Sequence, residues 1–272
     1  MQEKINWVNN LKIIGILVVI LGHIASPFGN FIYSWHMPLF FIMAGFFIQY
    51  NLSIKEFCIK DFRKLMIPYF IFAFIGIFVE TLKRVLLHRD SLEYSNELEG
   101  VFIWMDISSL INSYAFVLWF LPTLFIARVL LVLIDKSIKF YFIQVILIIL
   151  LFIISFFVNI PFAIDNAFNA ILYVYIGSIY FRFFQDNQLL NLLLFIVPII
   201  YFTVGIPPLD LAYKNYSNMV INVCFSLGIV YILILIFKRI NNGENILTKW
   251  GRNTMFLFIL HPYTNNIAHI IV

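Results

Sequence analysis

Long apolar runs separated by short polar segments make up most of this sequence. Each run has about 16 to 22 residues, close to the length that crosses a bilayer as an α-helix. A helix satisfies its own backbone hydrogen bonds in lipid, whereas barrel strands would show shorter segments of alternating polarity. The pattern therefore predicts an all-α, polytopic membrane helix bundle of about nine or ten transmembrane helices. The candidate spans are residues 7–25, 36–51, 66–87, 114–134, 140–159, 166–184, 189–205, 218–237 and 253–272.

The composition supports lipid as the solvent for most of this surface. Of the 272 residues, 62% are hydrophobic and 12% are charged, and the mean hydropathy is +0.95. A soluble domain carries about 25% charged residues, so this chain has too few polar side chains for a surface in water. We expect one transmembrane domain over residues 1–272, with no attached soluble domain. The net charge of +4 does not indicate nucleic-acid binding, because no basic domain lies outside the membrane.

The basic residues indicate how the chain is oriented in the membrane. With the N-terminus inside, thirteen Lys and Arg residues fall in the inner segments and four in the outer segments. Cytoplasmic loops of membrane proteins collect Lys and Arg. The bias predicts a multi-pass protein of the cell membrane with a cytoplasmic N-terminus.

The first span carries two ionisable residues at a helical spacing. Lys12 and His23 are eleven residues apart, which is almost three helical turns, so both lie on one face about 16 Å apart along the axis. This arrangement is consistent with a functional channel along the helix. The alternative is that Lys12 and His23 only mark the inner and outer membrane boundaries, since terminal Lys side chains snorkel.

A second histidine opens the next span. His36 is followed by Pro38, which is tolerated in the first turn of a helix, so the imidazole is expected at the outer end. His23 and His36 then flank one short loop, residues 24–35. Two imidazoles at one depth of a bundle favour proton handling near neutral pH. The alternative is a pair of interfacial histidines without a role.

Further charged residues suggest an anion site on the inner side. Lys60, Arg63 and Lys64 have the i, i+3, i+4 spacing of one helical face. Such a cluster suits phosphates, although contact with lipid headgroups is an equal alternative. Arg128 lies within the fourth span, where a charged residue indicates function unless its side chain snorkels to the membrane surface. Glu80, in the third span, has the same two interpretations.

Metal and disulfide chemistry are not expected. His261, Asn265 and His269 recur every four residues and resemble metal ligands only loosely, because no acidic residue joins them. Cys58 and Cys224 share no motif spacing. We therefore assign neither a metal site nor a disulfide.

These segments together resemble the membrane-bound acyltransferase-3 family of bacterial O-acyltransferases, which includes O-acetyltransferases. The first helix of that family has an Arg, ten further residues and a His, and here the pair is Lys12 and His23. Other similar segments are SWHMPLFFIMAGFF, FRKLMIPY, LWFLPTLF and GRNTMFLFILHP. Three residues depart from the family pattern: Lys12 stands for Arg, Asn9 for Asp and Trp35 for Phe.

The resemblance implies transfer of an acyl group, most often acetyl, from cytoplasmic acetyl-CoA to a hydroxyl of a surface glycan or a lipid-linked sugar. On this hypothesis His23 is the catalytic base, and His36 orients the acceptor or relays the proton. The residues expected to bind the acyl donor are Lys12, Lys60, Arg63, Lys64 and Arg128. Two alternatives stay open: a transporter or flippase of envelope precursors, and an inactive acyltransferase-like protein, for which Lys12 and Asn9 argue.

Overall fold

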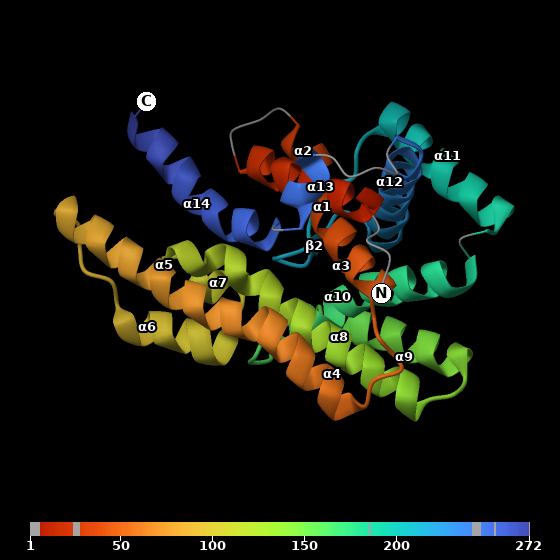
Figure 1. Ribbon diagram of the computed structural model, residues 1–272, viewed down its shortest axis with the longest axis horizontal. Coiled ribbons are helices and arrows are strands. Elements are labelled where there is room, and N and C mark those ends of the chain that lie inside the picture. Colours follow the sequence, from red (N-terminus) through yellow and green to blue (C-terminus); the bar gives the residue numbers. More distant parts are fainter. Residues whose placement is uncertain (1–5, 24–27, 185, 241–245, 253, 272) are drawn as a thin grey trace. The chain divides into compact units, whose positions relative to one another are not determined.

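The computed structural model describes residues 6–23, 28–184, 186–240, 246–252 and 254–271, apart from the side chains of residues 181, 182, 240 and 264–271 (Figure 1). Most of the described residues are helical, and the two strands among them, β1 and β2, form one short hairpin. The predicted all-α fold is therefore confirmed. The chain divides into two compact units, which are described separately below. Unit 1 comprises residues 1–40, 180–211 and 215–272, and unit 2 comprises residues 41–179 and 212–214. The single-domain prediction stays a prediction.

The apolar runs form helices of unequal length. Within the described ranges, three helical segments are long and apolar enough to cross a membrane: Ile54–Leu86, Tyr114–Ser137 and Met219–Arg239. Shorter apolar helices cover Asn6–Gly22, Tyr141–Ile154, Gln188–Val204 and Thr254–Tyr263. Each of the nine predicted spans coincides with a helix, but several helices are shorter than predicted. The helix at 36–51, for example, covers only His36–Phe46.

Unit 1 is built around the first helix, α1, which packs against α12, α13 and α14, while α12 also packs along α11. A short helix, α2, contacts the hairpin strand β1, and β1 pairs antiparallel with β2. Helix α3 begins in this unit and ends in unit 2. The elements are α1 (Asn6–Gly22), α2 (Gly29–Tyr33), α3 (His36–Phe46), η4 (Tyr180–Phe184), α11 (Gln188–Val204), β1 (Leu209–Asp210), β2 (Asn215–Tyr216), α12 (Met219–Ile240), α13 (Ile246–Gly251) and α14 (Thr254–Ile271).

Backbone contact fixes α13 against the start of α1. A Cβ added to Gly251 would lie 2.0 Å from the carbonyl oxygen of Asn9, so only glycine fits there. One turn earlier, the buried hydroxyl of Thr248 donates a hydrogen bond to Oδ1 of Asn10 at 3.0 Å. The GRNT segment of the sequence therefore begins with a residue that the packing of α1 requires.

Unit 2 contains the remaining helices. Within it, α10 packs between α8 and α9, and α5 packs against η3. Its elements are α4 (Ile54–Asp61), η1 (Phe62–Met66), α5 (Ile67–Leu86), α6 (Tyr94–Glu99), η2 (Gly100–Trp104), α7 (Ile107–Leu110), η3 (Tyr114–Trp119), α8 (Phe120–Ser137), α9 (Tyr141–Ile154) and α10 (Ile164–Ile179). Helix α3 touches α10 at glycines on both sides. A Cβ on Gly45 would meet the Val174 carbonyl oxygen at 2.1 Å, and one on Gly177 would meet that of Ile42 at 2.1 Å.

The longest helical segment of unit 2 starts at a capping box. The Ser53 hydroxyl accepts a hydrogen bond from the Glu56 backbone N–H at 3.2 Å, and the Glu56 carboxylate accepts one from the Ser53 N–H at 3.0 Å. Helix α4 then passes through the π-helical turn η1 into α5, whose first turn contains Pro68. Because the helical segment is continuous over Ile54–Leu86, Pro68, which has no N–H to donate, interrupts the hydrogen bonding between successive turns where η1 passes into α5.

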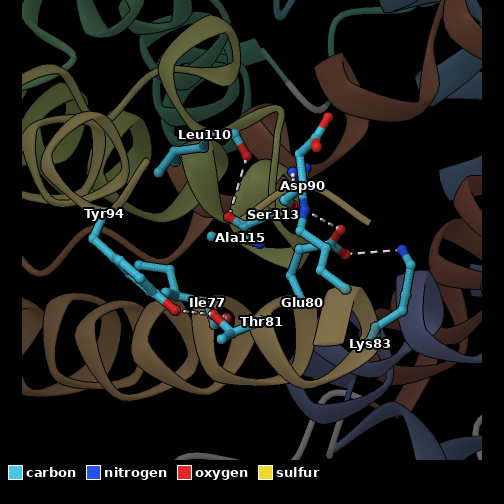
Figure 2. Close-up of polar contacts among 10 residues, drawn as sticks. Ile77, Glu80, Thr81, Lys83, Asp90, Tyr94, Leu110, Ser113 and Ala115 are labelled. Carbon is cyan, nitrogen blue, oxygen red and sulfur yellow. Dashed lines mark hydrogen bonds and ion pairs between the residues drawn. The ribbon is translucent and has the colours of Figure 1, made fainter. Parts of the chain in front are cut away.

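Figure 2 shows the far end of α5 and the polar segment that follows it. Glu80, which is buried, accepts a hydrogen bond from Lys83 at 2.8 Å and from Arg84 at 3.0 Å on the same helix. The Tyr94 hydroxyl lies 3.3 Å from the hydroxyl of Thr81. Glu80 is thus ion-paired near the end of α5. The polar segment 88–112 that follows contains the short helices α6, η2 and α7.

Candidate active site

The site in unit 1 begins where α1 ends. His23 directly follows the helix, and its backbone N–H still bonds to the carbonyl oxygens of Val19 and Ile20, both at 3.2 Å. The imidazole of His261, which projects from α14, lies against that of His23. Their ring centroids are 5.1 Å apart and their planes are tilted by 31°. Because α1 packs along α14, two histidines from opposite ends of the chain form one pair.

Tyr33 and His36 extend this pair into a row of four rings. The Tyr33 ring lies 6.4 Å from the ring of His23 and 5.0 Å from the ring of His36, edge to face in both cases. Tyr33 ends α2 and His36 begins α3, so the short connection between these helices sets their spacing. The predicted proximity of His23 and His36 is therefore seen as an indirect contact through Tyr33.

Hydrogen bonds to the backbone orient the two buried histidines. Nδ1 of His36 lies 2.8 Å from the carbonyl oxygen of Ile32, and Nδ1 of His261 lies 2.5 Å from that of Phe258. A carbonyl oxygen only accepts, so each Nδ1 carries a proton, and Nε2 is the acceptor whenever the ring is neutral. His23 is solvent-exposed, whereas His36 and His261 are 4% and 2% exposed. His23 is thus the histidine of the row that a substrate can reach.

The basic cluster of unit 2 surrounds a surface hollow. A depression of about 560 Å³ on α4 and η1 is lined by Lys60, Arg63 and Lys64, together with Glu56 and Ile59. The three cations are exposed, and Lys60 donates a hydrogen bond to Oε1 of Gln49 at 2.6 Å. The predicted clustering of the three basic residues is confirmed. Three cations against one carboxylate give the hollow a net positive lining that suits phosphate groups.

Arg128 is buried in unit 2 and forms an ion pair with Asp61. Its Nε lies 2.5 Å and its Nη2 3.4 Å from the two carboxylate oxygens of Asp61, and its Nη1 donates to the carbonyl oxygen of Ala44 at 2.6 Å. The guanidinium also lies 5.4 Å from the ring centroid of Phe57. A donor phosphate would have to compete with Asp61 for this side chain, so donor binding by Arg128 stays a prediction.

Comparison with known proteins identifies the family. A family model described as an acyltransferase domain, of the acyltransferase-3 type, matches residues 5–269, which is essentially the whole chain. The chain belongs to the acyltransferase-3 family. No curated protein and no solved structure matches this acyltransferase significantly. The family and the apolar helices together make the chain an acyltransferase of the membrane.

The predicted site residues of this acyltransferase fall into two groups. Lys12, His23 and His36 belong to unit 1, and Lys12 is half-buried on α1. The residues of the basic hollow and Arg128 belong to unit 2. The donor-binding role predicted for the basic residues stays a prediction, as does the catalytic role predicted for His23 and His36.

Sequence reasoning missed the partners of the predicted residues. The sequence gives no sign that His261 lies beside His23, because this proximity arises from the packing of α14 on α1. Among the described residues no three His, Cys, Asp or Glu side chains form a group that could hold a metal ion, while Asn265 and His269 lie outside the described side chains. Asp61 lies in the FCIKDFRKL segment, and an acid beside basic residues is the only local signal of its pairing with Arg128.

Proposed function

We propose that the chain is an O-acyltransferase of the cell membrane that transfers an acetyl group from acetyl-CoA to a hydroxyl of an extracytoplasmic or lipid-linked glycan. The single observation that carries the proposal is the exposed imidazole of His23 in a chain of the acyltransferase-3 family. The buried ring of His261 contacts this imidazole directly, and the buried ring of His36 contacts it through Tyr33. The N-terminus is cytoplasmic in this proposal, as the distribution of Lys and Arg favours.

The reaction needs a base for the acceptor hydroxyl. A ring nitrogen of His23 takes the hydroxyl proton as the oxygen attacks the thioester carbonyl. The tetrahedral intermediate then collapses, the carbon–sulfur bond breaks, and His23 returns the proton to the leaving thiolate. His261 and His36 hold the row of rings in place through their bonded Nδ1 atoms, which keeps His23 oriented.

The donor needs a cationic anchor because coenzyme A carries several phosphate charges. The hollow lined by Lys60, Arg63 and Lys64 supplies it, and a neutral surface would not hold this polyanion. Lys12, on the helix that His23 directly follows, is the further donor-binding residue in this proposal.

The experiment compares two histidine variants of the purified protein. His23→Asn should lower acetyl transfer from acetyl-CoA to glycan by about 100-fold or more, the usual contribution of a general base. His88→Asn is the matched control, because His88 is exposed beyond α5 and its φ of 50° suits asparagine. Equal transfer by both variants would remove His23 from the mechanism. Solute uptake into vesicles without transfer would indicate a transporter, and absence of acetyl-CoA binding would indicate an inactive family member.

A further inference from the structure

Unit 1 contains a pocket beside the row of rings. It has a volume of about 270 Å³ and lies between α2 and the β1–β2 hairpin. Its lining includes Tyr33 and four residues whose side chains are capable of hydrogen bonding: Asn30, Asp210, Asn215 and Ser217. Pockets for drug-sized ligands measure about 300–1,000 Å³, so this one suits a single small ring.

We propose that this pocket binds one uncharged sugar residue of the acceptor, an inference that rests on the proposed O-acyl transfer. The pocket adjoins the candidate base. Tyr33 forms part of its wall and also lies edge to face with His23 and His36. Asp210, on the opposite wall, is close enough to His23 for an electrostatic interaction. A sugar in the pocket would therefore present a hydroxyl near the His23 imidazole.

The chemistry of the lining selects a neutral polyol. Asp210 is the only charged residue among the lining residues that the structure gives for this pocket, and its carboxylate accepts hydrogen bonds from hydroxyls. The amides of Asn30 and Asn215 both donate and accept, as ring hydroxyls require. A sugar acid would place a second carboxylate beside Asp210, and the like charges would repel. Phosphate and carboxylate sites use Arg or Lys, and the described lining has neither.

Buried hydrogen bonds hold the pocket in shape. Asn222, which is 0% exposed on α12, donates to the carbonyl oxygens of Pro207 at 3.1 Å and Pro208 at 3.0 Å. Its own Oδ1 accepts from the Ser217 hydroxyl at 3.2 Å. One buried amide thus fixes the chain before β1 and the chain after β2. Such support from outside the lining is typical of a binding site that is formed before its ligand arrives.

The test measures sugar binding without acetyl-CoA, so that it does not depend on catalysis. The full chain in nanodiscs is titrated with methyl β-D-glucopyranoside and with methyl β-D-glucuronide, and binding is followed by saturation-transfer NMR. The wild type should bind the glucoside and not the glucuronide. Asn215→Leu fills the pocket at an exposed position and should weaken glucoside binding about tenfold, equivalent to one lost hydrogen-bonding group. Asp210→Asn should reduce the discrimination against the glucuronide.

Asp186→Asn is the control, since Asp186 is exposed just before α11 and is not among the lining residues given for the pocket. Wild type that binds neither glycoside, or Asn215→Leu that binds the glucoside as the wild type does, would overturn the proposal. Thermal melting of each variant checks that the fold is kept. Glucoside binding without any acetylation would refute the transfer reaction and leave the pocket assignment standing. Acetylation with an unchanged KM for the glucoside in Asn215→Leu would refute the pocket and leave the reaction standing.

Discussion

Replacing Asp61 by Asn leaves the guanidinium of Arg128 buried without its counter-charge. The two side chains are 4% and 10% exposed, and removing one partner from a buried ion pair costs about 3–5 kcal/mol. We expect the lower end, about 3 kcal/mol, because the hydrogen bond from Arg128 to the Ala44 carbonyl remains. At about 2–4 °C per kcal/mol for a chain of this size, the melting temperature should fall by about 6–12 °C.

The assay is thermal unfolding in detergent, with the folded fraction read by size-exclusion chromatography. Asp90→Asn is the control, because Asp90 is exposed and contributes its backbone carbonyl, not its side chain, to the hydrogen bond from Arg84. The double variant Asp61→Leu/Arg128→Met should recover most of the lost stability, since an apolar pair of similar volume is often neutral. Equal melting temperatures for the Asp61→Asn and Asp90→Asn variants would refute the buried ion pair. A raised KM for acetyl-CoA in the stable double variant would assign Arg128 to donor binding.

Two further predictions concern a close helix contact and a buried carboxyl group. Gly177→Ala gains about 1 kcal/mol of helix propensity but places a methyl against the Ile42 carbonyl, so we expect a net loss of about 2 kcal/mol in a thermal melt. Gly29→Ala, which meets nothing within 4 Å, should melt like wild type. Burial raises the pKa of Glu97, so its contribution to stability is present below the ordinary pKa and is lost as pH rises through the raised value. Glu97→Gln should therefore melt higher than wild type at pH 8 and equally at pH 4, and a constant difference would contradict this.

The sequence predicted features that depend on local pattern and missed those that depend on packing. Apolar length is a local property, so every predicted span falls on a helix. Helix ends are set by distant contacts, and α3 stops at Phe46, after which the Tyr50 hydroxyl lies 2.6 Å from that of Ser178 on α10. The histidine pair shows the same limit, because spacing along one helix gives no information on α14. The pocket was missed because its hairpin is too short to leave a strand pattern in the sequence.

The two recesses carry opposite charge, and this separates the two substrates of the proposed reaction. The hollow of unit 2 has three cations and one carboxylate, whereas Asp210 is the only charged residue given for the lining of the pocket of unit 1. In the proposed reaction a polyanionic donor is attracted to the hollow and repelled by Asp210, which disfavours its binding in the place of the sugar. An uncharged acceptor gains nothing from the cations and binds where hydrogen-bonding groups converge. Charge, together with the hydrogen-bonding groups of the pocket, thus favours a different recess for each substrate before either one contacts the reacting atoms.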